Sequence, residues 1–177
     1  MRLFIWIAGL AELGVSACAA TAQQRVRPVI VRAADQADVA FGVGGAATLT
    51  PPAQENFAQM RLIEHAGYRT PLHVHHKTDE TFVVLQGEMT VFVDGARTTL
   101  RQGEYVFLPR GTPHAQGNLT DEDAVILMTL APAAFAEFFS ARAQLVQETP
   151  PDHPDYGARM RALGQRFDIE IVGPTPF

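Results

Sequence analysis

The chain has 177 residues, a formal net charge of −5 and 47% hydrophobic residues, with 19% charged residues. This length and composition are typical of a single globular domain and exclude an intrinsically disordered chain. A chain of this size buries roughly 68–70% of its unfolded surface, which suffices for a core without disulfide bonds. The acidic balance argues against nucleic acid or an anionic membrane surface as a partner.

Residues 1–22 have the pattern of an export signal. Arg2 precedes the apolar run LFIWIAGL, and mostly small residues follow it. The run is too short to span a membrane. Residues 20–22 suit cleavage after a small-x-small sequence, whereas residues 15–18 resemble a bacterial lipobox with Cys18 as the lipid anchor. The sequence therefore predicts an exported protein, periplasmic or secreted. The alternatives are a membrane-anchored lipoprotein, a mis-assigned start codon or an ordinary apolar N-terminal strand.

The remaining chain, residues 26–177, is predicted to form one domain. Cys18 is the only cysteine, so the body of the chain contains no disulfide, no thiolate nucleophile and no cysteine metal ligand. We place the β-rich core at about residues 39–131 and a helical segment at about residues 132–167.

The first half of this domain reads as short strands. Residues 28–33 are a candidate strand, and residues 39–50 read as a strand broken at Gly44 and Gly45. Residues 57–65 alternate apolar and polar side chains, as a half-buried strand does. Further short strands follow between residues 72 and 130, with turn residues between them. This pattern predicts a sandwich, barrel or jelly roll.

One turn between these strands is especially well defined. Asp94 and Gly95 suit a two-residue hairpin turn, in which both central residues have positive φ.

The character of the sequence changes at Pro132. Residues 131–146 predict a helix with one apolar face, and residues 154–167 predict a second, shorter helix. The apolar face of the first helix comprises Phe135, Phe138, Phe139, Leu145 and Val146. The segment is too short for a core of its own, so we expect both helices to pack on the β-structure.

Three histidines in the stretch LHVHH indicate a metal site. Neutral imidazole and carboxylate donors suit borderline divalent metals. His73 and His75 are two positions apart on a predicted strand, so both rings share one face. His76 has the opposite parity and is predicted to point away, as a turn residue or a supporting neighbour of the site.

Two later residues are candidates to complete this site. Glu80 can join the histidines only if the chain bends at residues 76–79, where the polar sequence HKTD favours a turn or bulge. His114 follows a turn with proline and glycine and can begin a strand that faces the same interior. Three imidazoles and one carboxylate would leave an octahedral metal two open positions.

These residues fall in two motifs that resemble those of the cupin superfamily. The first motif comprises Gly67, His73, His75, Glu80 and Gly87, and the second comprises Gly103, Pro109, Gly111, His114 and Asn118. The chain looks like a single-domain bacterial cupin of the quercetin-dioxygenase-like group. The resemblance implies an all-β double-stranded β-helix, a small jelly-roll barrel, with C-terminal helices packed on it. It also implies that His73, His75, Glu80 and His114 hold one metal ion inside the barrel.

The resemblance implies a metal-dependent dioxygenase of quercetinase-like type, with a small organic, phenolic substrate and O₂ at the open metal positions. Glu80 would act as the proton acceptor. Two other functions stay open: a non-catalytic module that binds a small molecule or metal, and a cupin isomerase or decarboxylase. The sequence does not choose among Fe, Mn, Ni, Co, Cu and Zn. Many cupins pair through sheet edges, so the resemblance also implies a homodimer.

Aromatic residues on the predicted strands are candidates for a substrate pocket. Phe82, Phe92 and Phe107, with Tyr105, would line a pocket for an aromatic ligand, and Phe82 shares its parity with Glu80. The alternative is that these large side chains simply fill the barrel.

Overall fold

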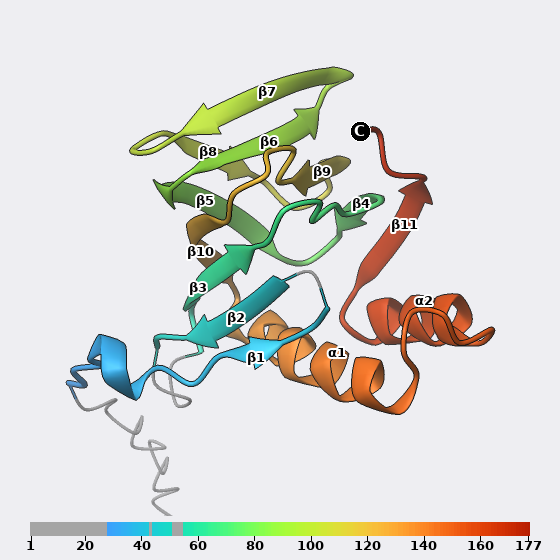
Figure 1. Cartoon of the computed structure of the whole chain (residues 1–177), viewed down its shortest axis with the longest axis horizontal. Coiled ribbons are helices and arrows are strands. Elements are labelled where there is room, and N and C mark those ends of the chain that lie inside the picture. The colour runs from blue at the N-terminus through green and yellow to red at the C-terminus, as the bar shows by residue number, and fades with distance from the viewer. Residues whose placement is uncertain (1–27, 43, 51–54) are drawn as a thin grey trace, which may run out of the picture.

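The computed structural model describes residues 28–42, 44–50 and 55–177 (Figure 1). The predicted export signal at residues 1–22, with its cleavage site and Cys18, lies outside the described residues. None of the helices in the described part of the chain is long and apolar enough to cross a membrane.

Two antiparallel β-sheets form the body of the protein. The six-stranded sheet has the order β1 (Val39–Ala40), β2 (Gly44–Thr48), β3 (Ala58–Glu64), β10 (Ala124–Ala131), β5 (Asp79–Gln86) and β8 (Tyr105–Leu108). The five-stranded sheet has the order β11 (Ile169–Gly173), β4 (Leu72–His75), β9 (His114–Gly117), β6 (Glu88–Val93) and β7 (Ala96–Arg101). Consecutive strands alternate repeatedly between the sheets, and the predicted jelly-roll fold is confirmed.

The hydrophobic core lies between the two sheets. Residues along β3 and β10 alternate between buried and half-buried, because successive side chains of a strand point to opposite faces. Met60 and Leu62 of β3 and Phe82 of β5 belong to the same buried cluster as Met89 and Val91 of β6. Side chains from both sheets thus pack together in a single core.

Two details near the start of the domain differ from the prediction. Residues 28–32 form no strand, and Val29 and Ile30 are exposed. No strand of the described residues pairs with them, and a short 3₁₀ helix, η1 (Ala33–Asp35), follows. The break in residues 39–50 falls between β1 and β2, before Gly44. Gly44 lies within β2, where a Cβ atom would sit 2.9 Å from the carbonyl oxygen of Ile63, so glycine permits close packing there.

The hairpin between β6 and β7 is confirmed. Asp94 and Gly95 both have positive φ, at 52° and 78°. Positive φ at both central residues defines a type I′ turn, whose twist matches that of the flanking strands.

The C-terminal segment forms a short 3₁₀ helix, η2 (Ala133–Ala136), and two α-helices, α1 (Glu137–Glu148) and α2 (Tyr156–Arg166). Helix α1 ends just before Pro150 and Pro151, since proline cannot continue a helix. Figure 1 shows α1 beneath β1 and β2, and α2 beneath β11. The helices pack on the β-structure, as expected.

Strand β11 was not predicted. It extends the five-stranded sheet beyond the predicted β-core at residues 39–131 and pairs with β4, with Ile169 opposite His75 and Ile171 opposite His73. The C-terminal residues therefore flank the strand that carries two of the candidate ligands.

The different environments of two phenylalanines lead to a prediction about stability. Phe82 is fully buried in the core, whereas Phe107 on the neighbouring strand β8 is 52% exposed. Phe82→Ala is expected to lower the free energy of unfolding by about 3 kcal/mol, because it leaves a cavity in the core. Phe107→Ala, the matched control, should change it by less than about 0.5 kcal/mol. Urea unfolding measures both; equal losses would contradict the assigned core.

Candidate metal centre

Strand pairing places two of the predicted ligands on neighbouring strands. β4 lies between β11 and β9 in the five-stranded sheet, and His73 on β4 is the direct partner of His114 on β9. Directly opposed residues of an antiparallel pair have Cβ atoms about 4.5–5.5 Å apart. Residues 41 positions apart in sequence thus become immediate neighbours.

A bend after His75 brings Glu80 to the same interior. β4 ends at His75 in one sheet, and β5 begins at Asp79 in the other, so the chain crosses between sheets at the predicted bend. Glu80 consequently faces the histidines from the opposite sheet. His76 lies in the bend, is exposed, and its Nε2 contacts Glu170 Oε2 at 2.8 Å, so it points away as predicted.

A backbone hydrogen bond connects the second motif to the same bend. The amide of Gly111 donates to the carbonyl oxygen of His75 at 2.8 Å. This bond holds the turn that precedes His114 against the end of β4.

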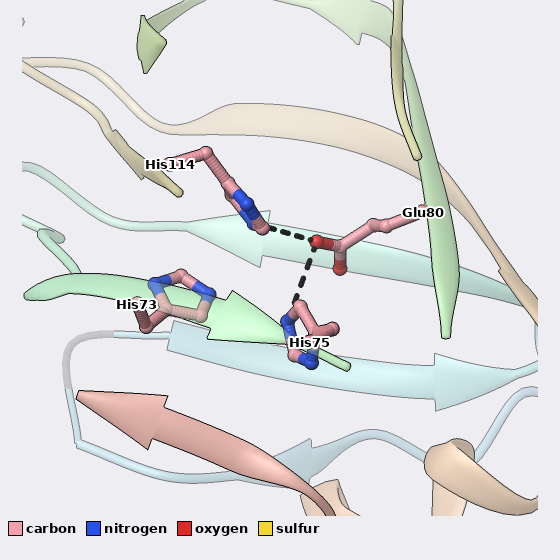
Figure 2. Close-up of side chains that lie close together, drawn as sticks. All are labelled: His73, His75, Glu80 and His114. Carbon is pink, nitrogen blue, oxygen red and sulfur yellow. Dashed lines mark hydrogen bonds and ion pairs between the residues drawn. The ribbon is translucent and has the colours of Figure 1, made fainter. Parts of the chain in front are cut away.

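The four predicted ligands form one buried cluster. One ligand atom from each of His73, His75, Glu80 and His114 lies within 4.8 Å of the others. Figure 2 shows the four side chains converging, with Glu80 Oε2 3.2 Å from His114 Nε2 and 3.7 Å from His75 Nε2. All four residues are at most 7% exposed. Such a donor set is compatible with one divalent transition metal.

Hydrogen bonds outside the cluster fix how two imidazoles are presented. The Nδ1 atoms of His73 and His114 each lie 2.9 Å from a backbone carbonyl oxygen, of Pro71 and Thr112 respectively. A carbonyl only accepts, so each Nδ1 carries the proton, and in the neutral ring Nε2 keeps its lone pair. Metal-binding histidines in proteins commonly have this arrangement. The supporting contacts of the cluster therefore fit a metal ion.

Burial and charge shift the titration of the cluster. Burial, with the nearby His114 and His75, lowers the pKa of His73 to about 3, so this ring is neutral. Burial also lowers the pKa of His75. Burial opposes ionisation of both Glu80 and His114, but their hydrogen bond and opposite charges lower the pKa of Glu80 and raise that of His114. A divalent cation would compete with protons for these donor atoms.

A cavity of about 390 Å³ adjoins the cluster. His73 and His75 contribute to its wall, together with side chains from the C-terminal segment. The ring of Phe135 stands perpendicular to that of His75, with centroids 4.5 Å apart, and Phe138 and Phe139 also line the cavity. A cavity of this size and apolar character suits a small organic ligand.

The phenylalanines predicted to line a pocket do not line this cavity. Phe82 is fully buried in the core, Phe92 is half-buried on β6, and Phe107 is exposed on β8. The aromatic wall instead comes from the C-terminal segment, including Phe135. The prediction assigned these helices to packing alone, although aromatic side chains at helical spacing directly after the barrel were the available signal.

A second buried carboxylate, which the sequence did not single out, lies on β3. Glu64 is fully buried, and neither carboxylate oxygen has a hydrogen-bond partner within the described residues. Burial, with the charge of Glu80 as a further cause, raises the pKa of Glu64 to about 8. Glu64 is therefore protonated at neutral pH.

The comparison with protein families agrees with the fold and the cluster. Residues 60–130 match the Cupin_2 family, described as a cupin domain, and this span contains both halves of the cluster. The chain therefore contains a cupin domain at residues 60–130.

Parts of this chain are similar in sequence to known proteins. A quercetin 2,3-dioxygenase of Bacillus subtilis is 47% identical over 45 residues, which are 25% of this chain and 13% of that enzyme. The chain spans half or less of the length of the curated relatives that it matches.

Solved structures show the same fold. A conserved cupin barrel protein from Salinispora arenicola is 26% identical, with a TM-score of 0.51, over 66% of this chain and 99% of that one. A Bacillus subtilis oxalate decarboxylase variant is also 26% identical, with a TM-score of 0.50, over 59% of this chain and 29% of that one.

Proposed function

We propose that the protein is a metal-dependent dioxygenase of quercetinase-like type, acting on a small phenolic substrate. The observation that carries the proposal is that His73 and His75 belong both to the buried ligand cluster and to the wall of the cavity. A ligand in that cavity would lie beside the metal. The partial identity with a quercetin 2,3-dioxygenase supports the choice of reaction.

The proposed roles follow from the donor chemistry. His73, His75, His114 and Glu80 would hold one divalent ion of Fe, Mn, Ni, Co, Cu or Zn, which supplies Lewis acidity and, for a redox metal, oxygen chemistry. The aromatic wall around Phe135 would bind the substrate ring and exclude water. Glu80 would accept the proton of the substrate hydroxyl at a carboxylate oxygen, since its lowered pKa keeps it ionised at neutral pH.

Oxygen consumption tests this proposal. Protein reconstituted separately with the six metals is expected to consume O₂ on addition of a flavonol or catechol with at least one of them, and not without metal. Glu80→Gln is expected to lower turnover by about 100-fold or more, the usual contribution of a general base. Glu170→Gln is the control, because Glu170 is exposed and contacts only His76 among the interactions seen for its side chain.

Three outcomes would contradict parts of the proposal. No O₂ uptake with any of these substrates and metals would contradict the dioxygenase function. Full turnover by metal-loaded Glu80→Gln would exclude Glu80 as the base. An effect of Glu170→Gln as large as that of Glu80→Gln would show that the loss is not specific to the cluster.

A decarboxylase or isomerase is the second candidate. The structural similarity to an oxalate decarboxylase favours it, and the same ligands would serve a Lewis acid. Turnover under anaerobic conditions distinguishes this candidate from a dioxygenase. Ligand binding without any turnover would instead indicate a non-catalytic binding module.

Export and dimerisation are proposed on the sequence alone. Residues 1–22 predict secretion to the periplasm or beyond, with Cys18 as the site of a lipid anchor in the alternative. Recovery of the full-length chain from the cytoplasm would contradict export. Light scattering at the mass of one chain would contradict the homodimer.

A further inference from the structure

The cavity beside the cluster is positively charged although the chain is acidic. Arg69, Arg142 and Arg161 line it, and no aspartate or glutamate of the described residues is part of its wall. The whole chain carries a net charge of −5. A concentration of one sign of charge in a low-dielectric concavity raises the local concentration of ligands of opposite sign.

Arg142 is the innermost of these cations. Arg69 and Arg161 are exposed, whereas Arg142 is half-buried on α1, three and four positions after Phe139 and Phe138. This spacing places Arg142 on the same helical face as the aromatic residues that line the cavity.

The contacts of Arg142 hold its guanidinium but leave it without a counter-ion. Its Cζ atom lies 4.4 Å from the centre of the Phe41 ring, and its charge partly offsets the burial that raises the pKa of Tyr68, another residue of the cavity wall. Its buried Nε has no hydrogen-bond partner among the described residues, and none of their ion pairs includes it. A buried polar group without a partner is costly, so a ligand that accepts from this guanidinium would relieve a deficit.

We propose that the cavity binds a small carboxylic acid with an aromatic body, and that Arg142 pairs with its carboxylate. A guanidinium presents two parallel N–H donors that match the two oxygens of a carboxylate. The aromatic body of the acid would lie against Phe135, Phe138 and Phe139. The exposed Arg69 and Arg161 would attract the anion to the cavity. The claim that this acid is the substrate rests on the proposed function, whereas the claim that the cavity binds it does not.

Matched acids and amides provide the test. The probes are benzoate, phenylacetate and 3-phenylpropionate, each beside its neutral amide of nearly the same shape. Calorimetric titration of the metal-loaded full chain is expected to show tighter binding of at least one acid than of its amide, by about 10- to 100-fold. Arg142→Gln is expected to remove this preference while the amide still binds as before.

Two further variants make the result specific. Arg142→Lys keeps the charge but loses the paired donors, so it should retain only part of the preference. Arg159→Gln is the control, since Arg159 lies on α2 outside this cavity and donates to Thr149. If Arg142→Gln does not fold, Arg142→Lys decides the question: an unchanged preference would overturn the proposal.

Several outcomes would overturn the assignment of Arg142. These are the absence of binding by all three acids, equal affinity for every acid and its amide, and a preference that persists in Arg142→Gln. The last outcome would show that another positive charge, from the metal, Arg69 or Arg161, determines the preference. Failure of the dioxygenase proposal would give a different result: the acids would bind through Arg142, but the protein would not consume O₂ when they are added. Conversely, O₂ uptake with neutral phenols that is unaffected in Arg142→Gln would support the dioxygenase function and contradict the acid as its substrate.

Discussion

Replacing His114 with alanine is expected to weaken the binding of a divalent transition metal by more than about 100-fold. Residues that only support metal ligands commonly change affinity by about 10- to 100-fold, and a ligand itself should contribute more. His114 is 2% exposed and lies 3.2 Å from Glu80 in the cluster. Calorimetric titration of the metal-free protein with Zn²⁺ and Co²⁺ measures the effect.

His76 offers a matched control for this experiment. It belongs to the same histidine-rich stretch, but it is exposed and contacts Glu170 on the outside of the molecule. His76→Ala should therefore leave metal affinity within about threefold of the parent, as for a surface substitution. Equal losses for His76→Ala and His114→Ala would contradict the assignment of the site.

Replacing Glu64 with glutamine is expected to remove a large part of the pH dependence of stability. The folded protein holds a proton on Glu64 up to a pKa of about 8, whereas an unfolded glutamate loses it near 4.5. The stabilising contribution of this proton is fully present below pH 4.5 and is lost as pH rises through about 8. Between pH 5 and 9 the loss amounts to about 4 kcal/mol in the parent.

Urea unfolding of metal-free protein at pH 5 and 9 measures this prediction. Glu64→Gln should be nearly as stable as the parent at pH 5 and more stable at pH 9, because glutamine cannot ionise. Glu122→Gln is the control, since Glu122 is exposed. If the stabilities of the parent and of Glu64→Gln change equally between the two pH values, the result would contradict the assignment of Glu64 as buried and protonated.

The spacing of the ligands in sequence predicted much of the cluster geometry. A strand has a strict period of two, so His73 and His75 had to share a face and His76 had to point away. The polar residues after His75 indicated the bend that lets Glu80 return. Local rules of this kind were sufficient because each acts over a few residues.

The cavity wall was not predictable by such local rules. It depends on how the C-terminal segment folds back, which sets Phe135 against His75, and on β11, whose pairing with β4 joins residues almost a hundred positions apart. A single sequence carries little information about such distant pairings. The aromatic residues of the strands were therefore the candidates for the pocket, although Phe82 lies in the core and Phe107 is exposed.

Glu64 escaped prediction for a related reason. Its position on β3 has the parity of the core-facing Met60 and Leu62, so the alternating pattern itself marks a carboxylate among buried residues. Only its complete burial near Glu80, with no hydrogen-bond partner among the described residues, shows that it is held in its protonated form.

X-ray absorption at the metal edge tests the central claim most directly. The protein purified from its own source should contain about one transition metal per chain, surrounded by nitrogen and oxygen donors at about 2.0–2.2 Å. The multiple-scattering pattern should require three imidazoles, from His73, His75 and His114. No bound metal, or a shell dominated by sulfur or containing fewer than three imidazoles, would contradict the site described for this cupin.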